Sequence, residues 1–369
     1  MLQLSSSYAR STVGAVLSIA VAIGLAACGS SSSSNNSTPS AQTSASAAPA
    51  TNASAAATTG GAQPTLNVVS GNEVPDPIEG YDYVAAARGY FTQEGVKVNL
   101  ATPPSGTVAM SDVVSGRADV DYGSLEPLPA AVQSGAKVVT IFQQAYSPLF
   151  SVAYFNPAVH GIPGLKGRTI GIVSASSASV PLLNSVFAKE GLKPGAVTTV
   201  PVGLGATTVA AVKAKRIDAD LLTPEFGPYL AAAKIPYTTE PLPGLDGNYP
   251  GFGAVVSRQT LSSKRDALVK YLRAVIKAEK FCQADVAGCA AAYKSGAHST
   301  VPVSLLQQEL AIDNKLYTLS PKAQRSYGLG IAANWQTMID IQHDAGVIKP
   351  GLTPTQMFAN DLVSSANGG

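Results

Sequence analysis

From residue 65 onward, two hydrophobic patterns alternate along the chain. Short apolar runs, such as 65–70 and 169–173, predict buried strands. Between such runs, apolar residues recur every three or four positions, as in 182–187, which predicts a helix with one buried face. Strands that alternate with helices indicate a mostly parallel sheet flanked by helices. The folded part is therefore expected to belong to the α/β class.

The pattern divides the folded part into three stretches. Strands are expected at 65–70, 96–100, 119–122, 138–143 and 150–155 in a first lobe, and at 169–173, 197–200 and up to Leu222 in a second. A Pro- and Gly-rich stretch, 240–251, is expected to lead out of the second lobe, and 252–257 to return to the first as a strand. Amphipathic helices are predicted at 264–281, 285–293, 302–317, 331–345 and 354–363.

An internal repeat supports two similar lobes. The segment Arg-Ala-Asp-Val-Asp-Tyr-Gly-Ser-Leu-Glu recurs 99 residues later as Arg-Ile-Asp-Ala-Asp-Leu-Leu-Thr-Pro-Glu. Each copy ends a predicted strand with a hydroxyl and then a carboxylate, at the edge where open α/β sheets bind ligands. Chance similarity of two strand-to-helix turns is the alternative. The matching residues are Arg117, Asp119, Asp121, Ser124 and Glu126 in the first copy and Arg216, Asp218, Asp220, Thr223 and Glu225 in the second.

The N-terminal stretch resembles a bacterial lipoprotein signal. Residues 1–27 carry one charged side chain, Arg10, and an apolar run that is too short to span a bilayer. The run closes on Leu-Ala-Ala-Cys, which predicts lipidation of Cys28; the alternative is an ordinary signal peptide with an incidental cysteine. Residues 28–64 are rich in Ser and Ala and carry no charge, which predicts a disordered tether.

Composition excludes several function classes. The formal net charge is +2, and no cluster of Lys and Arg is interleaved with aromatics, so nucleic acid is not an expected partner. The chain has three His and three Cys, so it has few residues for metal binding or for His-dependent catalysis. We expect no metal, no cofactor and no catalytic residue.

Cys282 and Cys289 lie in a predicted extracytoplasmic domain, where disulfides persist. On one unbroken helix their Cα atoms would be about 10 Å apart, which is too far for a bond. A disulfide therefore requires a helix break, for which Asp285 is a suitable cap and Gly288 a loosening residue. Two small core residues without a bond are the alternative.

Several segments, in order, resemble one family. They are Gly-Tyr-Phe-Thr-Gln-Glu-Gly-Val-Lys-Val from Gly89, Gly-Arg-Ala-Asp-Val-Asp-Tyr-Gly from Gly116, Leu-Lys-Gly-Arg-Thr-Ile-Gly from Leu165, and Asn-Trp-Gln from Asn334 with the later Ala-Gly-Val from Ala345. Over about 65–363 the chain is similar to the solute-binding lipoproteins of ABC importers for nitrate, sulfonates, taurine and thiamine precursors. The resemblance implies a type II periplasmic binding protein fold, with 65–157 and 250–369 as lobe 1 and 158–249 as lobe 2.

If both lobes present the loops after their strands to one cleft, these loops form the ligand site. Serine hydroxyls and backbone N–H groups at helix starts favour an anion, whereas two glutamates favour a ligand with N–H donors. An aminosulfonate or a pyrimidine-type ring is therefore expected; the alternatives are serines that only cap helices and glutamates that turn outward. The candidate residues are Asn72, Ser105, Ser124, Glu126, Ser174, Ser176, Ser177, Thr223, Glu225 and, as an apolar wall, Tyr249.

The resemblance implies a monomeric binding component, held by its lipid at the periplasmic or outer face of a bacterial membrane, that delivers a small solute to an ABC permease with its ATPase. A tethered solute sensor for a membrane receptor is one alternative. A thiamine-pyrimidine synthase is a less favoured one, since the cysteine-rich motif of those enzymes is missing from the sequence.

Overall fold

The computed structural model describes residues 62–70, 77, 80–146, 150–177, 179–243, 249–317 and 327–367. The predicted signal, Cys28 and most of the predicted tether lie outside these residues, and so does Asn72. Lipidation and the tether therefore stay predictions. Within the described residues, no helix combines the length and the hydropathy that a membrane span requires.

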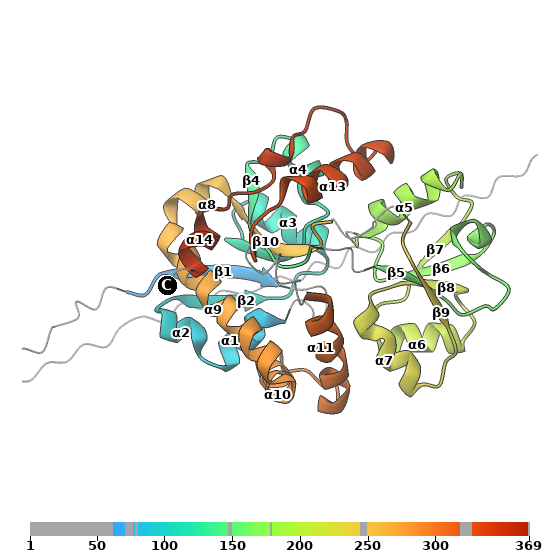
Figure 1. Cartoon of the computed structure of the whole chain (residues 1–369), viewed down its shortest axis with the longest axis horizontal. Coiled ribbons are helices and arrows are strands. Elements are labelled where there is room, and N and C mark those ends of the chain that lie inside the picture. Colours follow the sequence, from blue (N-terminus) through green and yellow to red (C-terminus); the bar gives the residue numbers. More distant parts are fainter. Residues whose placement is uncertain are drawn as a thin grey trace, which may run out of the picture. The chain divides into compact units, whose positions relative to one another are not determined.

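The first sheet has five strands in the order β2-β1-β3-β10-β4 (Figure 1). β1 runs parallel to both β2 and β3, and β10 runs antiparallel to β3 and β4. The return strand predicted at 252–257 is thereby confirmed. The elements are β1 (Thr65–Ser70), α1 (Tyr81–Ala87), α2 (Tyr90–Glu94), β2 (Lys97–Ala101), α3 (Gly106–Val114), β3 (Val120–Ser124), α4 (Leu128–Gln133), β4 (Val138–Gln143) and β10 (Phe252–Ser257).

The second sheet also has five strands, in the order β7-β6-β8-β5-β9. β6 is parallel to β7 and β8, and β5 is antiparallel to β8 and β9. In Figure 1 this sheet and its helices are drawn in green to yellow. The elements are β5 (Ser151–Tyr154), η2 (Ile162–Leu165), β6 (Thr169–Ile172), α5 (Ser179–Lys189), β7 (Thr198–Pro201), α6 (Ala206–Lys213), β8 (Ala219–Leu222), η3 (Pro224–Phe226), α7 (Gly227–Ala232) and β9 (Thr238–Pro241).

The two sheets are built on one plan, so the sequence repeat is structural. Each pairs three parallel strands with two further ones, the fourth position being antiparallel in both. The first acid of each repeat, Asp119 or Asp218, accepts a hydrogen bond from a backbone amide of the neighbouring strand. The Asn67 amide donates to Asp119 Oδ2 at 2.9 Å, and the Thr169 amide donates to Asp218 Oδ2 at 3.1 Å. Both aspartates thus tie the start of one strand to its neighbour, and neither is a ligand group.

One strand lies in a different sheet from the one predicted. The segment 150–155, expected in the first lobe, forms β5 and pairs with β8 and β9 of the second sheet. In the first sheet, β10 occupies the position between β3 and β4. β9 (Thr238–Pro241) was also not predicted, since its second half, Glu240 and Pro241, was assigned to the exit path. The lobe boundaries remain a prediction.

Helices follow β10, as the amphipathic pattern predicts. On α9 the apolar positions Leu268, Tyr271, Leu272 and Val275 are buried against the first sheet's core. The last predicted helix differs, because a 3₁₀ turn at Pro354–Gln356 precedes a separate helix. The helices are α8 (Arg258–Ser263), α9 (Arg265–Ala284), α10 (Val286–Gly296), α11 (Val303–Tyr317), α13 (Ala332–Asp344) and α14 (Asp361–Asn367).

Cys282 and Cys289 form a disulfide, as one of the two alternatives predicts. The expected helix break is present: α9 ends at Ala284, and Asp285 caps α10 by accepting from the Gly288 amide at 2.8 Å. The break brings the Cα atoms of Cys282 and Cys289 to 4.8 Å from each other. The disulfide therefore fixes the corner between α9 and α10.

Replacing both cysteines with alanine is expected to lower the free energy of unfolding by roughly 2 to 3 kcal/mol, the entropy that a short cross-linked loop removes from the unfolded chain. Urea denaturation of the wild type with its disulfide intact, and of the double variant, measures this difference. Wild-type protein under a reducing agent should approach the double variant. Equal stability of oxidised wild type and variant would contradict the prediction.

Candidate functional site

The hydroxyl and the carboxylate at the end of β3 lie together, as the sequence predicts. Ser124 Oγ donates to Glu126 Oε2, and the Glu126 side chain is buried. Burial raises the pKa of Glu126 to about 8, although its own backbone N–H partly opposes the rise. From the distant helix α13, Gln342 Nε2 donates to the Glu126 carbonyl at 2.8 Å. This glutamate is therefore held inside the protein and does not turn outward.

Tyr249 lies near Glu126 along neighbouring segments, since the Leu125 amide donates to the Gly251 carbonyl at 3.0 Å. Its side chain is fully buried, and burial first and the Glu126 charge second raise the pKa of its hydroxyl. Its backbone amide donates to the Tyr146 carbonyl at 3.2 Å, and the Gly251 amide donates to Ala145 at 3.3 Å, so the two chain segments between the sheets run side by side. Tyr249 thus lies on one of the two crossings, the chain segments that connect the two sheets.

Two polar atoms at this place lack a hydrogen bond. Among the described residues, neither Glu126 Oε1 nor the Tyr249 hydroxyl has a partner, and both are buried. A buried polar group without a partner costs about 1 to 3 kcal/mol, so natural proteins keep one where it serves a purpose. The pair is the strongest candidate for a ligand contact among the predicted residues.

The serine loops of the two halves also meet. Thr107 Oγ1, in the first turn of α3, donates to the Ser176 carbonyl at 3.0 Å. Ser174 Oγ lies 3.4 Å from Ser176 Oγ, and Ser177 Oγ lies 2.9 Å from Ser179 Oγ. The loop after β6 therefore reaches the helix start that follows β2, as expected for two halves that share one cleft.

Ser105 has a structural role in this arrangement. Its hydroxyl oxygen accepts from the Val108 amide at 3.3 Å and caps α3, and the residue is buried. The interpretation that the serine only caps a helix thus fits Ser105. Its neighbour Thr107, which lies in the same predicted cleft loop, makes the bond between the halves.

The second repeat places its carboxylate elsewhere. Thr223 and Glu225 are buried at η3, which packs against α11. Gln342 of α13 binds the backbone of Glu126, whereas η3 packs against α11. That one ligand reaches both glutamates stays a prediction. Each sits beside a different helix of the C-terminal region.

The second acid of each repeat is buried inside its sheet. Burial raises the pKa of Asp121, and it raises that of Asp220 to about 7. Asp220 is accommodated by the neighbouring strand, where a Cβ on Gly171 would lie 2.3 Å from Asp220 Oδ1. The paired position to Asp121 is Val69. These carboxyl groups belong to β3 and β8 and precede the predicted site residues Ser124 and Thr223 along the chain.

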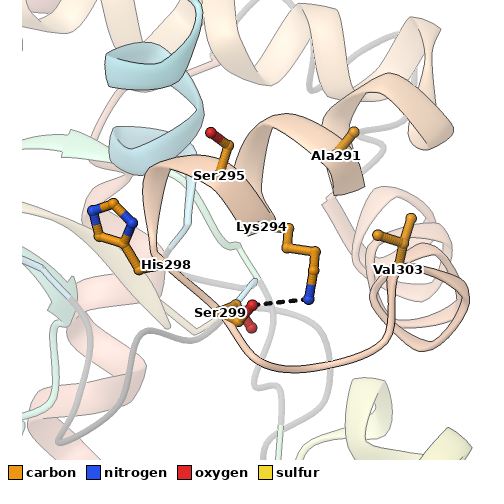
Figure 2. A pocket seen from close by; sticks show the side chains of 6 residues that line it. All are labelled: Ala291, Lys294, Ser295, His298, Ser299 and Val303. Carbon is orange, nitrogen blue, oxygen red and sulfur yellow. Dashed lines mark hydrogen bonds between the residues drawn. The ribbon is translucent and has the colours of Figure 1, made fainter.

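A hollow between α10 and α11 lies apart from the predicted residues (Figure 2). The ammonium group of Lys294, which lines the hollow, donates to the carbonyls of Ser299 at 2.9 Å and Val301 at 2.6 Å. The ammonium therefore closes the turn after α10 and is already supplied with acceptors. Within the described residues, no group of three His, Cys, Asp or Glu side chains is arranged to hold a metal ion.

Sequence reasoning missed Gln342, which lies 216 residues beyond the carbonyl it binds. It also missed the buried acids of the C-terminal helices, Glu279, Glu309 and Asp313. Each stands in an amphipathic pattern that predicts packing alone. The available signal was an acidic residue at a position where the helical period requires an apolar one.

Residues 80–286 match the family model described as "NMT1/THI5 like". A search of curated protein sequences finds no match. Among solved structures, a protein from Bordetella bronchiseptica RB50 is 24% identical, with a TM-score of 0.67 over 82% of this chain and 97% of that one.

Two further solved structures bear on function. The alkanesulfonate-binding protein SsuA from Xanthomonas axonopodis pv. citri, bound to MOPS, has a TM-score of 0.59 at 18% identity, over 81% of this chain and 99% of that one. The desulfurization enzyme DszB has a TM-score of 0.55 at 14% identity, over 83% of this chain and 99% of that one. At these identities the likeness shows the fold, which is the predicted two-lobed α/β fold of periplasmic binding proteins.

Proposed function

We propose that this chain, which belongs to the NMT1/THI5-like family, is the solute-binding component of an ABC importer. It captures a small organic solute between its two halves and delivers it to a membrane permease with its ATPase. The buried pair of Glu126 and Tyr249 at the crossings carries the proposal, because both keep a polar atom without a partner where the two sheets connect.

The proposed ligand carries hydrogen-bond donors. Glu126 Oε1 is a buried acceptor, so a ligand N–H or O–H would offset its lost hydration. The serine loop after β6 offers hydroxyls and backbone N–H groups for an acidic group. An aminosulfonate or a nitrogenous, pyrimidine-type ring meets both demands. SsuA supports the first of these, since its structure holds the sulfonate MOPS.

Closure would follow from contacts made to both halves at once, because a ligand shifts a conformational equilibrium only through differential affinity. Without a ligand, the bond from Thr107 to the Ser176 carbonyl already joins the two halves. The permease would then recognise the closed state. We further propose that the protein acts as a monomer, is exported, and is anchored through a lipid on Cys28 outside the cytoplasm.

Two other functions compete. A tethered sensor would use the same fold and the same ligand, and differs only in presenting the closed state to a receptor. An enzyme is conceivable because DszB shares the fold. The structure offers little for catalysis by histidine. His160 is exposed after β5, His298 lies on the turn beside the α10–α11 hollow, and His343 lies in the last turn of α13. We therefore favour binding over catalysis.

A thermal-shift screen of the purified chain tests the proposal. The panel contains taurine, alkyl- and arylsulfonates, nitrate, pyrimidines and aromatic acids. A ligand at 100 times its Kd stabilises the folded state by about 2.7 kcal/mol and so raises the Tm. Transport requires in addition that the liganded protein stimulate the ATPase of its permease. Binding without such stimulation would favour the sensor, and turnover of a hit would favour the enzyme.

Glu126→Ala and Glu225→Ala are each expected to weaken binding of the screen's best ligand by about 1 to 3 kcal/mol, because each removes an acceptor for a ligand donor. Isothermal titration calorimetry measures the change. Glu190→Ala, at an exposed position, serves as the matched control. Unchanged affinity in both site variants would contradict the site assignment and leave the fold intact.

A further inference from the structure

Basic side chains gather on the solvent-facing side of α9. In the second half of this helix, exposed or half-buried bases recur at steps of three and four residues, which place them on one face. They are Lys270, Arg273, Lys277 and Lys280. Lys264 and Arg265, which precede them, are each paired with an acid of another element. The surplus of positive charge therefore begins at Lys270.

Arg88 and helix α2 complete this face. The guanidinium carbon of Arg88 lies 4.3 Å from the centre of the Phe281 ring and 5.9 Å from that of Tyr90. Lys277 Nζ lies 5.6 Å from the centre of the Tyr90 ring and 3.0 Å from Glu94 Oε1. The bases thus surround two aromatic rings. We call this surface the α9 face; its residues are Arg88, Tyr90, Glu94, Lys270, Arg273, Lys277, Lys280 and Phe281.

The α9 face is more positive than the chain as a whole. It has five bases and one acid, Glu94, whereas the formal net charge of the whole chain is +2. The other acid of this part of α9, Glu279, is buried. Arg273 and Lys270 donate to backbone carbonyls, which are uncharged acceptors and leave the positive charge in place. The face therefore attracts a negatively charged partner.

The chain enters the fold near this face. β1 begins at Thr65, and the Thr65 carbonyl accepts from Lys264 Nζ at 3.3 Å, at the start of α9. The sequence predicts a tether over 28–64 and a lipid on Cys28. The predicted connection to the membrane therefore joins the folded part near the end of α9 from which the basic stripe extends.

These two observations together select an anionic lipid surface. Lys and Arg side chains near a membrane are attracted to anionic headgroups, and tyrosine is enriched at the boundary between water and lipid. An acidic protein or a nucleic acid offers the same charge. The predicted anchor, however, would hold the face close to a membrane at high effective concentration, so that a weak contact suffices.

We propose that the α9 face docks on the anionic lipid headgroups of the membrane to which the chain is anchored. This goes beyond the proposed function, because it concerns where the protein stays between encounters with its permease. In Figure 1, α2 and α9 are drawn on the left, and the second sheet with its helices is drawn on the right. The docked protein would thus keep its second half away from the lipid.

Sedimentation with lipid vesicles tests the docking. The protein is the predicted mature chain, 28–369, with Cys28→Ser, so that no lipid anchor contributes. We expect it to sediment with vesicles of equal parts phosphatidylcholine and phosphatidylglycerol at low salt. It should sediment neither with phosphatidylcholine alone nor at high salt, which screens the charges. Replacing Lys277 and Lys280 together with Gln should weaken binding to the mixed vesicles at least fivefold.

The matched control replaces Lys193 and Lys213 with Gln, which removes the same charge from exposed positions of the second half. It should bind the mixed vesicles like the parent protein, and circular dichroism should show both double variants folded. Three results would overturn the inference, namely equal binding to both kinds of vesicle, binding that salt does not weaken, and equal losses in the two double variants.

Another class of partner has its own signature. Stronger binding to polyglutamate or to single-stranded DNA than to the mixed vesicles, with the same variant effects, would overturn the lipid assignment and give the face to an acidic macromolecule. Thermal shift with the best solute should be equal in both double variants. Failure of the docking would therefore leave the importer proposal standing, and failure of the importer proposal would leave vesicle binding unchanged.

Discussion

The ligand-free chain is expected to lose several kcal/mol of its free energy of unfolding as the pH rises from about 5 to about 8. Burial is the main cause that raises the pKa of Asp82 and Asp220 to about 7 and of Glu126 and Glu279 to about 8. In the unfolded chain these acids titrate near their ordinary values, around 4. Each unit of difference corresponds to about 1.4 kcal/mol.

The sign follows from proton counting. Between about pH 4.5 and 8 the folded chain holds more protons than the unfolded one, so its stability is greatest below the unfolded pKa values. That stability is lost as the pH rises through the folded values. Urea denaturation at a series of pH values measures the slope.

Glu126→Gln should flatten this slope, because the amide carries no proton to lose. The exposed Glu190→Gln should leave it as in the wild type. A free energy of unfolding that is constant across this range would contradict the prediction.

Trp335→Ala is expected to lower the free energy of unfolding by about 3 to 5 kcal/mol. Trp335 is fully buried on α13, in a hydrophobic cluster that includes Tyr249 and residues of both sheets, such as Val255 and Ile170. Within the described residues, its indole Nε1 has no hydrogen-bond partner, so the cost is one of packing. Truncation opens a cavity between the two halves.

Chemical denaturation measures the loss, and Trp335→Phe is the matched control because it keeps an aromatic ring. We expect the phenylalanine variant to be clearly more stable than the alanine one. A loss below about 1 kcal/mol in Trp335→Ala would mean that the neighbouring side chains close the cavity, and would contradict the prediction.

The sequence was sufficient for features with a local cause. Hydrophobic periodicity located most strands and helices. The spacing of Cys282 and Cys289 showed that a bond requires a helix break and pointed to Asp285 as its cap, with the bond as one of two alternatives. The repeat anticipated two sheets of one plan. These features depend on residues near one another in the chain, or on two copies of one pattern.

Features that depend on distant partners were missed. A strand such as β5 has the same composition in either sheet, and only the return of β10 decides which sheet has room for it. The surroundings of Glu126 and Glu225 differ although their sequence contexts match, because α13 approaches one and α11 the other. Periodicity predicts that a helix is amphipathic but not where its buried acids point.

One crossing runs from β4 to β5 and the other from β9 to β10, and at each end these strands are paired with one another. Gln143 of β4 is opposite Gly253 of β10 in the first sheet, and Ser151 of β5 is opposite Pro241 of β9 in the second. The second half is thus an insert in the loop of a hairpin, and its own ends are adjacent. A short turn from β4 to β10 would recreate that hairpin, and the excised piece would have its ends ready to be joined or fused. Such an arrangement is what makes one domain transplantable into another.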